Sequence, residues 1–256
     1  MLPQVNIIRA KNGDFLSFYE AAGISGVLTV HGVWDEVTIL IAKALIDASN
    51  KKPIVFDIGA NMGTFAIPLS KHIINRNGVL HAFEPQRIVY YQLCGNIFLN
   101  RMDNVFAHNI ALSTMNSEEE IAILNYKEAW NIGAYSLVPG KDGQEKILSK
   151  DKCQFIKLDD FIEESSITLM KIDVEGMELE VINGGISKII NSGYPPILFE
   201  SNKTDTKANQ VFDVLIKLGY QIVKYAEEDC LAQHPLWESE IELSISNGQI
   251  AIARKR

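Results

Sequence analysis

Residues Val55–Ala66 read VFDIGANMGTFA, and this stretch decides the fold class that the sequence predicts. An apolar run ends at Asp57, and Gly59 and Gly63 then bracket Asn61. The resulting order, Asp-x-Gly-x-Asn-x-Gly, differs from the G-x-G-x-x-G of a dinucleotide site. Since ligands of open parallel sheets bind beyond the carboxyl ends of the strands, the segment is predicted to be a ligand loop at that edge.

The rest of the chain repeats this alternation. Apolar strand-like runs such as PIVFDIG, GVLHAFEP, ITLMKID and PPILFES are followed by amphipathic segments such as TFAIPLSKHII and ANQVFDVLIKLGY. Strands nearly free of polar residues are typical of a parallel sheet covered by helices on both faces. The chain is therefore predicted to be of the α/β class.

Two regions depart from the alternation. Residues 1–50 predict a short hairpin and then a helix at WDEVTILIAKALIDA, packing on a core domain of residues 51–256. Residues 113–158 are polar and rich in Gly, Lys and Glu where a crossover helix would be expected. An insert at the ligand edge of a sheet is often a lid or a substrate loop, and this one is interpreted in that way.

Composition limits the class of protein. The 256 residues suffice for one large domain, and the net charge of −8 argues against broad binding to nucleic acid. Three separated cysteines fit neither a disulfide framework nor a zinc site. No apolar run approaches the roughly 20 residues of a membrane span, and no secretory signal is recognised. A soluble cytoplasmic protein without a nucleic-acid partner is expected.

The nature of the ligand follows from two acids. A pyrophosphate would be repelled by Asp57, whereas a cationic ligand would be attracted. Glu84 ends the next strand, and a carboxylate there can accept hydrogen bonds from both hydroxyls of a ribose. A ribose and a cation without phosphates describe S-adenosylmethionine. The alternative is that Gly59 and Gly63 only form a tight turn and that Glu84 is a surface acid.

Seven motifs in order resemble those of the FkbM-type S-adenosylmethionine-dependent methyltransferases. They are FDIGANMGTFA, HAFEP, NIFLN, IALS, KLDDF, KIDVEGMELEVINGG and PPILFE, and the resemblance as a whole covers roughly Trp34 to Tyr220. The resemblance implies a seven-stranded Rossmann-like sheet that is mostly parallel with an antiparallel last strand. It also implies O-methylation of a hydroxyl on a sugar, glycan or natural product.

The resemblance assigns cofactor-binding residues, and some of them have alternatives. Asn61 either contacts the cofactor or caps the helix that follows. His108 is expected to point away from Asn109 because side chains alternate along a strand. The cofactor-binding residues predicted are Asp57, Gly59, Asn61, Gly63, Glu84, Pro85, Asn109, Ala111 and Asp173.

Catalysis is placed at the fourth strand. Lys171, Asp173 and Glu175 occupy alternate positions of LMKIDVEG and would share one face of a strand. Lys171 would pair with an acid such as Glu200, and a buried structural network is the alternative to a catalytic role. An alcohol acceptor benefits from a base, for which Asp173, Glu175 and Glu200 are candidates, with His31 as an outside candidate.

The sequence also allows three other hypotheses about the site and its function. Asp173, Glu200 and Asn202 resemble an oxygen ligand set for magnesium, although no metal is assigned. An N-methyltransferase would carry an Asn/Asp-Pro-Pro-aromatic motif, where this chain has Asp-Val-Glu-Gly. A catalytically degenerate S-adenosylmethionine-binding module is the non-enzymatic alternative. The acceptor is expected to be a small molecule or a glycan, and the sequence does not define the oligomeric state.

Overall fold

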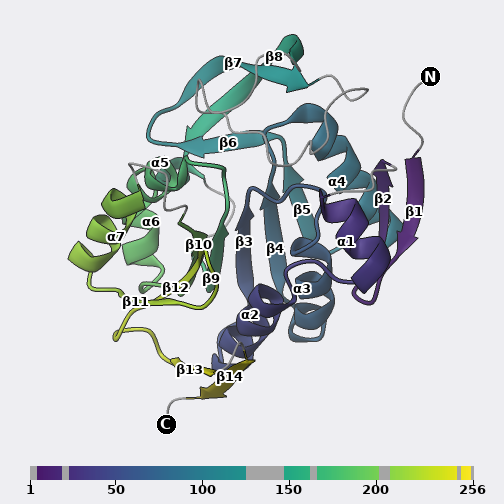
Figure 1. The fold of residues 1–256 in the computed structure, drawn as a ribbon. Coiled ribbons are helices and arrows are strands. Elements are labelled where there is room, and N and C mark those ends of the chain that lie inside the picture. Colours follow the sequence, from purple (N-terminus) through teal and green to yellow (C-terminus); the bar gives the residue numbers. More distant parts are fainter. Residues whose placement is uncertain are drawn as a thin grey trace.

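The structure is a computed structural model that describes residues 5–18, 23–124, 147–161, 166–201, 208–246 and 249–254. At its centre lies a seven-stranded sheet in the order β11-β12-β10-β9-β3-β4-β5 (Figure 1). Strands β5, β4, β3, β9 and β10 are mutually parallel, and β12 is antiparallel to both β10 and β11. The predicted seven-stranded, mostly parallel sheet is confirmed. Its strands are β3 (Ile54–Ile58), β4 (Val79–Phe83), β5 (Val105–His108), β9 (Leu169–Ile172), β10 (Ile197–Glu200), β11 (Gln221–Lys224) and β12 (Asp229–Gln233).

Helices cover both faces of the sheet. Successive residues of a strand point to opposite faces, so alternate side chains enter two separate hydrophobic clusters, each of which also includes helix side chains. Val55 packs with one cluster, whereas Phe56 packs with the other. The first cluster includes side chains of α2 (Glu36–Ala48), α3 (Ala66–Ile73) and α4 (Arg87–Leu99). The second includes side chains of α5 (Glu178–Asn183), α6 (Ile186–Asn191) and α7 (Ala208–Lys217). Two short 3₁₀ turns, η1 (Ile74–Arg76) and η3 (Leu158–Asp160), complete the connections.

The N-terminal and C-terminal parts of the chain form smaller elements outside the central sheet. Strands β1 (Val5–Arg9) and β2 (Asp14–Phe18) form an antiparallel hairpin, and the helix α1 (Gly23–His31) follows it. Helix α1 was not predicted, because its sequence was assigned to no element. A second hairpin, β13 (Ile241–Ser246) and β14 (Gln249–Arg254), packs against α2.

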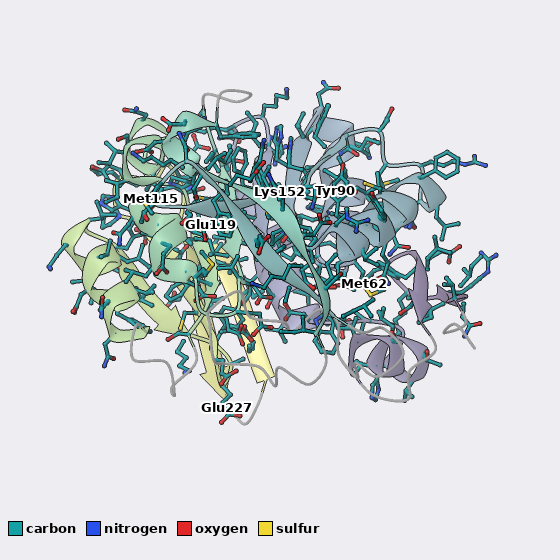
Figure 2. All side chains as sticks on the ribbon, turned by 90° about the horizontal axis from the view of Figure 1, so that it is seen from above. Met62, Tyr90, Met115, Glu119, Lys152 and Glu227 are labelled. Carbon is teal, nitrogen blue, oxygen red and sulfur yellow. The ribbon has the colours of Figure 1, made fainter. Side chains whose placement is uncertain are left out.

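The two ends of the insert form strands, which join β6 in a three-stranded sheet of order β6-β8-β7 that the sequence did not predict. Its strands are β6 (Ile110–Ser113), β7 (Ser117–Leu124) and β8 (Ile147–Lys157), and residues 125–146 lie outside the described part. Figure 2 looks down on the β7–β8 pair, where Glu119 and Lys152 are labelled. The single strand that was expected to contain both His108 and Asn109 is therefore divided at Asn109: β5 belongs to the central sheet and β6 to the insert.

None of the helices in the described segments is by itself long and apolar enough to cross a membrane. Helices α1 and α2 together satisfy the same test of length and composition, and they meet at an angle of 78°.

The insert is held to the core by a close contact at the end of α5, which gives a testable prediction. A Cβ at Gly184 would lie 1.9 Å from the carbonyl oxygen of Ser113 in β6. Backbone on both sides prevents relief, so Gly184→Ala should lower the free energy of unfolding by about 2 kcal/mol or more. Urea denaturation measures this.

The control is Gly95→Ala in α4, whose added Cβ would meet the flexible end of Leu16 at 3.0 Å. Alanine stabilises a helix interior by about 1 kcal/mol relative to glycine, so this variant should be at least as stable as the wild type. Equal stability of the Gly184 variant and the wild type would contradict the proposed contact.

Candidate active site

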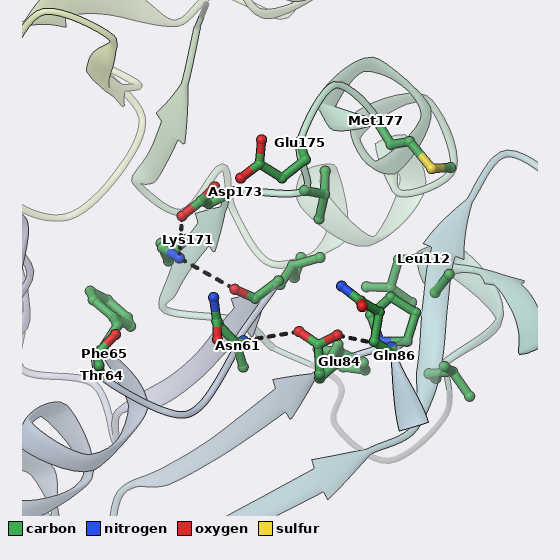
Figure 3. A pocket seen from close by; sticks show the side chains of 18 of the residues that line it. Asn61, Thr64, Phe65, Glu84, Gln86, Leu112, Lys171, Asp173, Glu175 and Met177 are labelled. Atoms are coloured by element: carbon green, nitrogen blue, oxygen red, sulfur yellow. Dashed lines mark hydrogen bonds and ion pairs between the residues drawn. The ribbon is translucent and has the colours of Figure 1, made fainter. Parts of the chain in front are cut away.

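A pocket lies at the carboxyl ends of β3, β4 and β9, the edge at which the sequence placed the ligand (Figure 3). It encloses about 1060 Å³, including the part that opens to solvent. Seven of the predicted site residues line it, and four do not. The lining residues are Gly59, Asn61, Glu84, Pro85, Ala111, Asp173 and Glu175, and the other four are Asp57, Gly63, Asn109 and Glu200.

The loop after β3 touches the loop after β9 through backbone atoms. Gly59 has a φ of +83°, and a Cβ there would lie 1.8 Å from the carbonyl oxygen of Asp173. The Asp173 N–H donates to the carbonyl oxygen of Ile58 at 3.0 Å. Because only glycine permits both this φ and this approach, Gly59 sets the distance between the two loops.

Asn61 also has a left-handed backbone, with a φ of 50°. Its Oδ1 accepts the N–H of Met62 at 2.7 Å. Helix α3 begins only at Ala66, so the alternative in which Asn61 caps that helix is wrong. The side chain of Asn61 instead stabilises the loop itself.

Glu84 presents a buried carboxylate at the end of β4, with 5% of the residue exposed. Its Oε2 accepts the N–H of Asn61 at 3.0 Å, and its Oε1 accepts the N–H of Gln86 at 2.9 Å (Figure 3). Burial raises the pKa of Glu84 to about 7, and the two backbone hydrogen bonds oppose this rise. Each oxygen keeps a second lone pair, with which it can accept one further hydrogen bond.

Asn109 lies behind Glu84 and does not enter the pocket. Its Nδ2 donates to the carbonyl oxygens of Glu84 at 2.8 Å and Pro85 at 2.9 Å. Both N–H groups are therefore directed at the backbone that carries the carboxylate. The contact with adenine that was expected of Asn109 is replaced by this backbone contact, whereas Ala111 lines the pocket as expected.

Lys171 joins the tips of β3 and β9. Its Nζ lies 2.9 Å from Asp173 Oδ2 and 3.7 Å from Asp57 Oδ1, and it points toward the carbonyl oxygen of Gly59 at 3.5 Å. The expectation that Lys171 pairs with Glu200 is corrected to Asp57 and Asp173. Burial alone would lower the pKa of Lys171, but the charges of Asp173 and Asp57 raise it.

Asp57 is fully buried beneath the pocket, and neither carboxylate oxygen has a hydrogen-bond partner within the described residues. Burial raises the pKa of Asp57 to about 6, against the opposing charge of Lys171. Asp57 therefore holds Lys171, and does not itself form the pocket wall.

Asp173 and Glu200 form an acid pair beside the lysine. Strand β9 ends at Ile172, so Asp173 and Glu175 lie on a loop and not on the strand face that was predicted. Burial, followed by the charge of Asp173, raises the pKa of Glu200 to about 9. Burial opposes ionisation of Asp173 too, but Lys171 lowers its pKa. The pKa values of the two acids are thus shifted in opposite directions, and 40% of the Asp173 side chain is exposed.

The N-terminal elements supply pocket residues that sequence reasoning missed. Ile24, Trp34 and Asp35 line the pocket. Asp35 has a φ of 52°, and the hydroxyl of Thr38 donates to its Oδ1 at 2.5 Å. No sequence motif marks these residues, since only the packing of α1 and α2 brings them to the loops. His31, the outside candidate for a base, is exposed and does not line the pocket.

Within the described ranges there is no group of three or more His, Cys, Asp or Glu side chains arranged to hold a metal ion. Asn202, the third member of the magnesium set considered from sequence, lies outside those ranges.

The profile of the family described as Methyltransferase FkbM domain matches residues 57–222. The chain belongs to this family, as its motifs predicted. The predicted cofactor, S-adenosylmethionine, is confirmed as that of the family.

A curated relative shares 34% identity over 104 residues, which are 40% of this chain and 40% of the relative. It is the tRNA(Phe) (4-demethylwyosine(37)-C(7)) aminocarboxypropyltransferase of Methanocaldococcus jannaschii, and less than half of its length is matched. The expectation that nucleic acid is not a partner is overturned by this comparison, because the relative is named for its action on a tRNA.

Two solved structures have a similar fold. The methyltransferase FkbM of Methylobacillus flagellatus is 20% identical, with a TM-score of 0.47 over 71% of this chain and 43% of that one. A 16S rRNA methyltransferase of T. thermophilus, in complex with AdoMet and guanosine, is 13% identical, with a TM-score of 0.49 over 91% and 51%. Likenesses of this size carry no argument about the acceptor.

The titration of Glu84 gives a pH-dependent prediction. Its ionised form can accept hydrogen bonds from both hydroxyls of a ribose, so affinity for S-adenosylhomocysteine should rise as the pH is raised from about 6 to 8 through its pKa. Glu84→Gln should remove this rise and weaken binding about tenfold at the higher pH. Calorimetry at several pH values measures both effects.

Stability provides the control for this variant. Because the pKa is raised in the folded state, ionising Glu84 lowers the free energy of unfolding as the pH rises from 4.5 to about 7. The wild type should lose stability relative to Glu84→Gln over that window. Parallel pH profiles of affinity in the two proteins would refute the assignment of Glu84 to the ribose.

The pairing of Lys171 with Asp57 gives a prediction about stability. Lys171→Met leaves the buried Asp57 without its cation, and breaking a buried pair costs about 3–5 kcal/mol. The free energy of unfolding should fall by that amount, and the double variant Lys171→Met/Asp57→Asn should recover part of the loss. Additive losses in the double variant would show that the two charges do not stabilise each other.

Proposed function

We propose that this chain transfers the methyl group of S-adenosylmethionine to a hydroxyl oxygen of a sugar, glycan or natural product. The observation that supports this is the position of Asp173, which lines the pocket beside Glu175 and whose Oδ2 pairs with Lys171 Nζ at 2.9 Å. A carboxylate in this position can accept the hydrogen bond of an alcohol and then its proton.

Three features of the pocket fit the cofactor. Glu84 has the free lone pairs that a ribose diol requires. Gly59 brings the loop after β3 against the loop after β9, so that both loops border one pocket. The lining carries the carboxyl groups of Asp35, Glu84, Asp173 and Glu175 against the ammonium of Lys171, a balance that suits a cationic ligand.

In this proposal, each part of the cofactor is bound by a different set of residues. We assign the loop of Gly59 and Asn61 to the methionine part, Glu84 and Pro85 to the ribose, and Ala111 to the adenine. Asp57 and Asn109 act from beneath, by holding Lys171 and the Glu84 backbone. The absence of a side chain at Gly63 lets Leu93 of α4 approach the loop closely. When bound, the cofactor supplies an electrophilic methyl group on a sulfonium.

The acceptor side is assigned to Asp173, Glu175 and Glu200. Asp173 orients the hydroxyl and takes its proton, and Glu175 positions the rest of the acceptor. Burial and the neighbouring Asp173 raise the pKa of Glu200, which disfavours a second negative charge beside Asp173. In the proposed division of the chain, residues 51–256 bind the cofactor, and residues 1–50 and the insert at 113–158 border the acceptor.

The function is tested in two stages. Calorimetry should show one S-adenosylhomocysteine bound per chain, and failure to bind would refute the proposal. Transfer from S-adenosylmethionine carrying a tritiated methyl group is then measured with simple glycosides, hydroxylated natural products and transcribed tRNA. Label that enters only amines or bases would refute transfer to oxygen.

Two carboxylate variants test the catalytic assignments. Asp173→Asn and Glu175→Gln keep the shape of the side chains, so S-adenosylhomocysteine should still bind. Loss of acid–base help should lower turnover by about 10²–10⁴-fold in Asp173→Asn. In Glu175→Gln, kcat should fall less than in Asp173→Asn, and the KM for the acceptor should rise more. A variant that binds cofactor and turns over like the wild type would remove its residue from the mechanism.

A further inference from the structure

The motif NIFLN, Asn96–Asn100, has a structural partner that the proposed function does not use. Gln92 and Asn96 on α4 and Asn100 at its C-cap are spaced four residues apart, so their amides share one face of the helix. This face lies along β2 of the N-terminal hairpin, and the amides bond to the backbone of two alternate residues there, Asp14 and Leu16.

The contacts resemble the pairing of a strand edge. Asn100 accepts the Asp14 N–H at 3.0 Å and donates to the Asp14 carbonyl at 2.6 Å. Asn96 accepts the Leu16 N–H at 2.6 Å, and Gln92 donates to the Leu16 carbonyl at 2.7 Å. Three amides of α4 and its cap thus bond the N–H and carbonyl groups of both Asp14 and Leu16 in β2.

Asn96 alone of these three also holds the backbone of the cofactor loop. Its Nδ2 donates to the carbonyl oxygen of Met62 at 2.8 Å, and the residue is fully buried. Met62 stands between Asn61 and Gly63, and Figure 2 shows it on the side of the molecule that the N-terminal elements occupy. One buried side chain therefore bonds the hairpin through its oxygen and the loop through its nitrogen.

We propose that Asn96 is a positioning residue that fastens the cofactor loop to the N-terminal hairpin, so that the hairpin contributes to cofactor affinity. A buried carbonyl that loses its donor must reorient or remain unsatisfied, and the Met62 peptide is part of the loop that carries Asn61 and Gly63. The hairpin lies outside residues 57–222, so the segment matched by the family profile does not contain the whole support of its own loop. This inference rests on the proposed function of the pocket.

A matched pair of variants tests it. Asn96→Asp keeps an oxygen for the Leu16 N–H but sets a carboxylate against the Met62 carbonyl. Asn100→Asp makes the same change in the same row of amides, against the Asp14 carbonyl, without touching the loop. Asn96→Asp should weaken S-adenosylhomocysteine binding about tenfold, and Asn100→Asp less than about twofold, although both lower the free energy of unfolding.

The outcomes separate the two proposals. If the wild type does not bind S-adenosylhomocysteine, the proposed function fails. If it binds and Asn96→Asp binds equally well, or if Asn100→Asp weakens binding as much, the positioning role fails alone. Circular dichroism at the assay temperature establishes that each variant is folded.

A measurement on the wild type covers the case in which Asn96→Asp does not fold. Linkage is reciprocal, so a ligand that stabilises the loop must stabilise the hairpin to which it is fastened. Saturating S-adenosylhomocysteine should slow hydrogen exchange at the Leu16 amide, which donates to Asn96, by about tenfold. Slower exchange in the loop with no change at Leu16 would overturn the inference.

Discussion

The ion pairing of Lys171 is the interaction on which the pocket depends. A buried ammonium needs a counter-charge, and Lys171 finds Asp57 from the tip of β3 and Asp173 from the loop after β9. Those two strands are neighbours in the sheet, so the lysine fixes their ends relative to each other. Lys171 also lowers the pKa of Asp173 against the effect of burial, whereas burial and then the charge of Asp173 raise the pKa of Glu200.

Backbone contacts also fix the positions of the loops that follow these strands. Gly59 approaches Asp173 so closely that no side chain fits between them, and its carbonyl faces Lys171. On the other side, Asn61 donates its N–H to Glu84, whose own backbone is held by Asn109. The loop after β3 is therefore bonded to both neighbouring strand ends, which preorganises the walls of the pocket before any ligand arrives.

The N-terminal elements belong to the same construction. Ile24, Trp34 and Asp35 line the pocket, and the amides of α4 bond the hairpin on one side and the Met62 carbonyl on the other. The pocket is thus built partly from residues that carry no family motif. This explains why membership of the family establishes the cofactor while the acceptor needs its own experiments.

Sequence alone determined the parts of this protein that depend on local pattern. Alternating apolar runs specified a parallel sheet, and the Asp57-x-Gly59-x-Asn61-x-Gly63 turn with Glu84 specified the cofactor, because these features require particular residues at fixed spacings. Tertiary structure decided which charges meet. Lys171 pairs with Asp57, which is 114 residues away in the chain, and Asn109 turns to the backbone of Glu84. Such partners are chosen by strand order and by the need to neutralise buried charge, and neither is visible in the spacing of a motif.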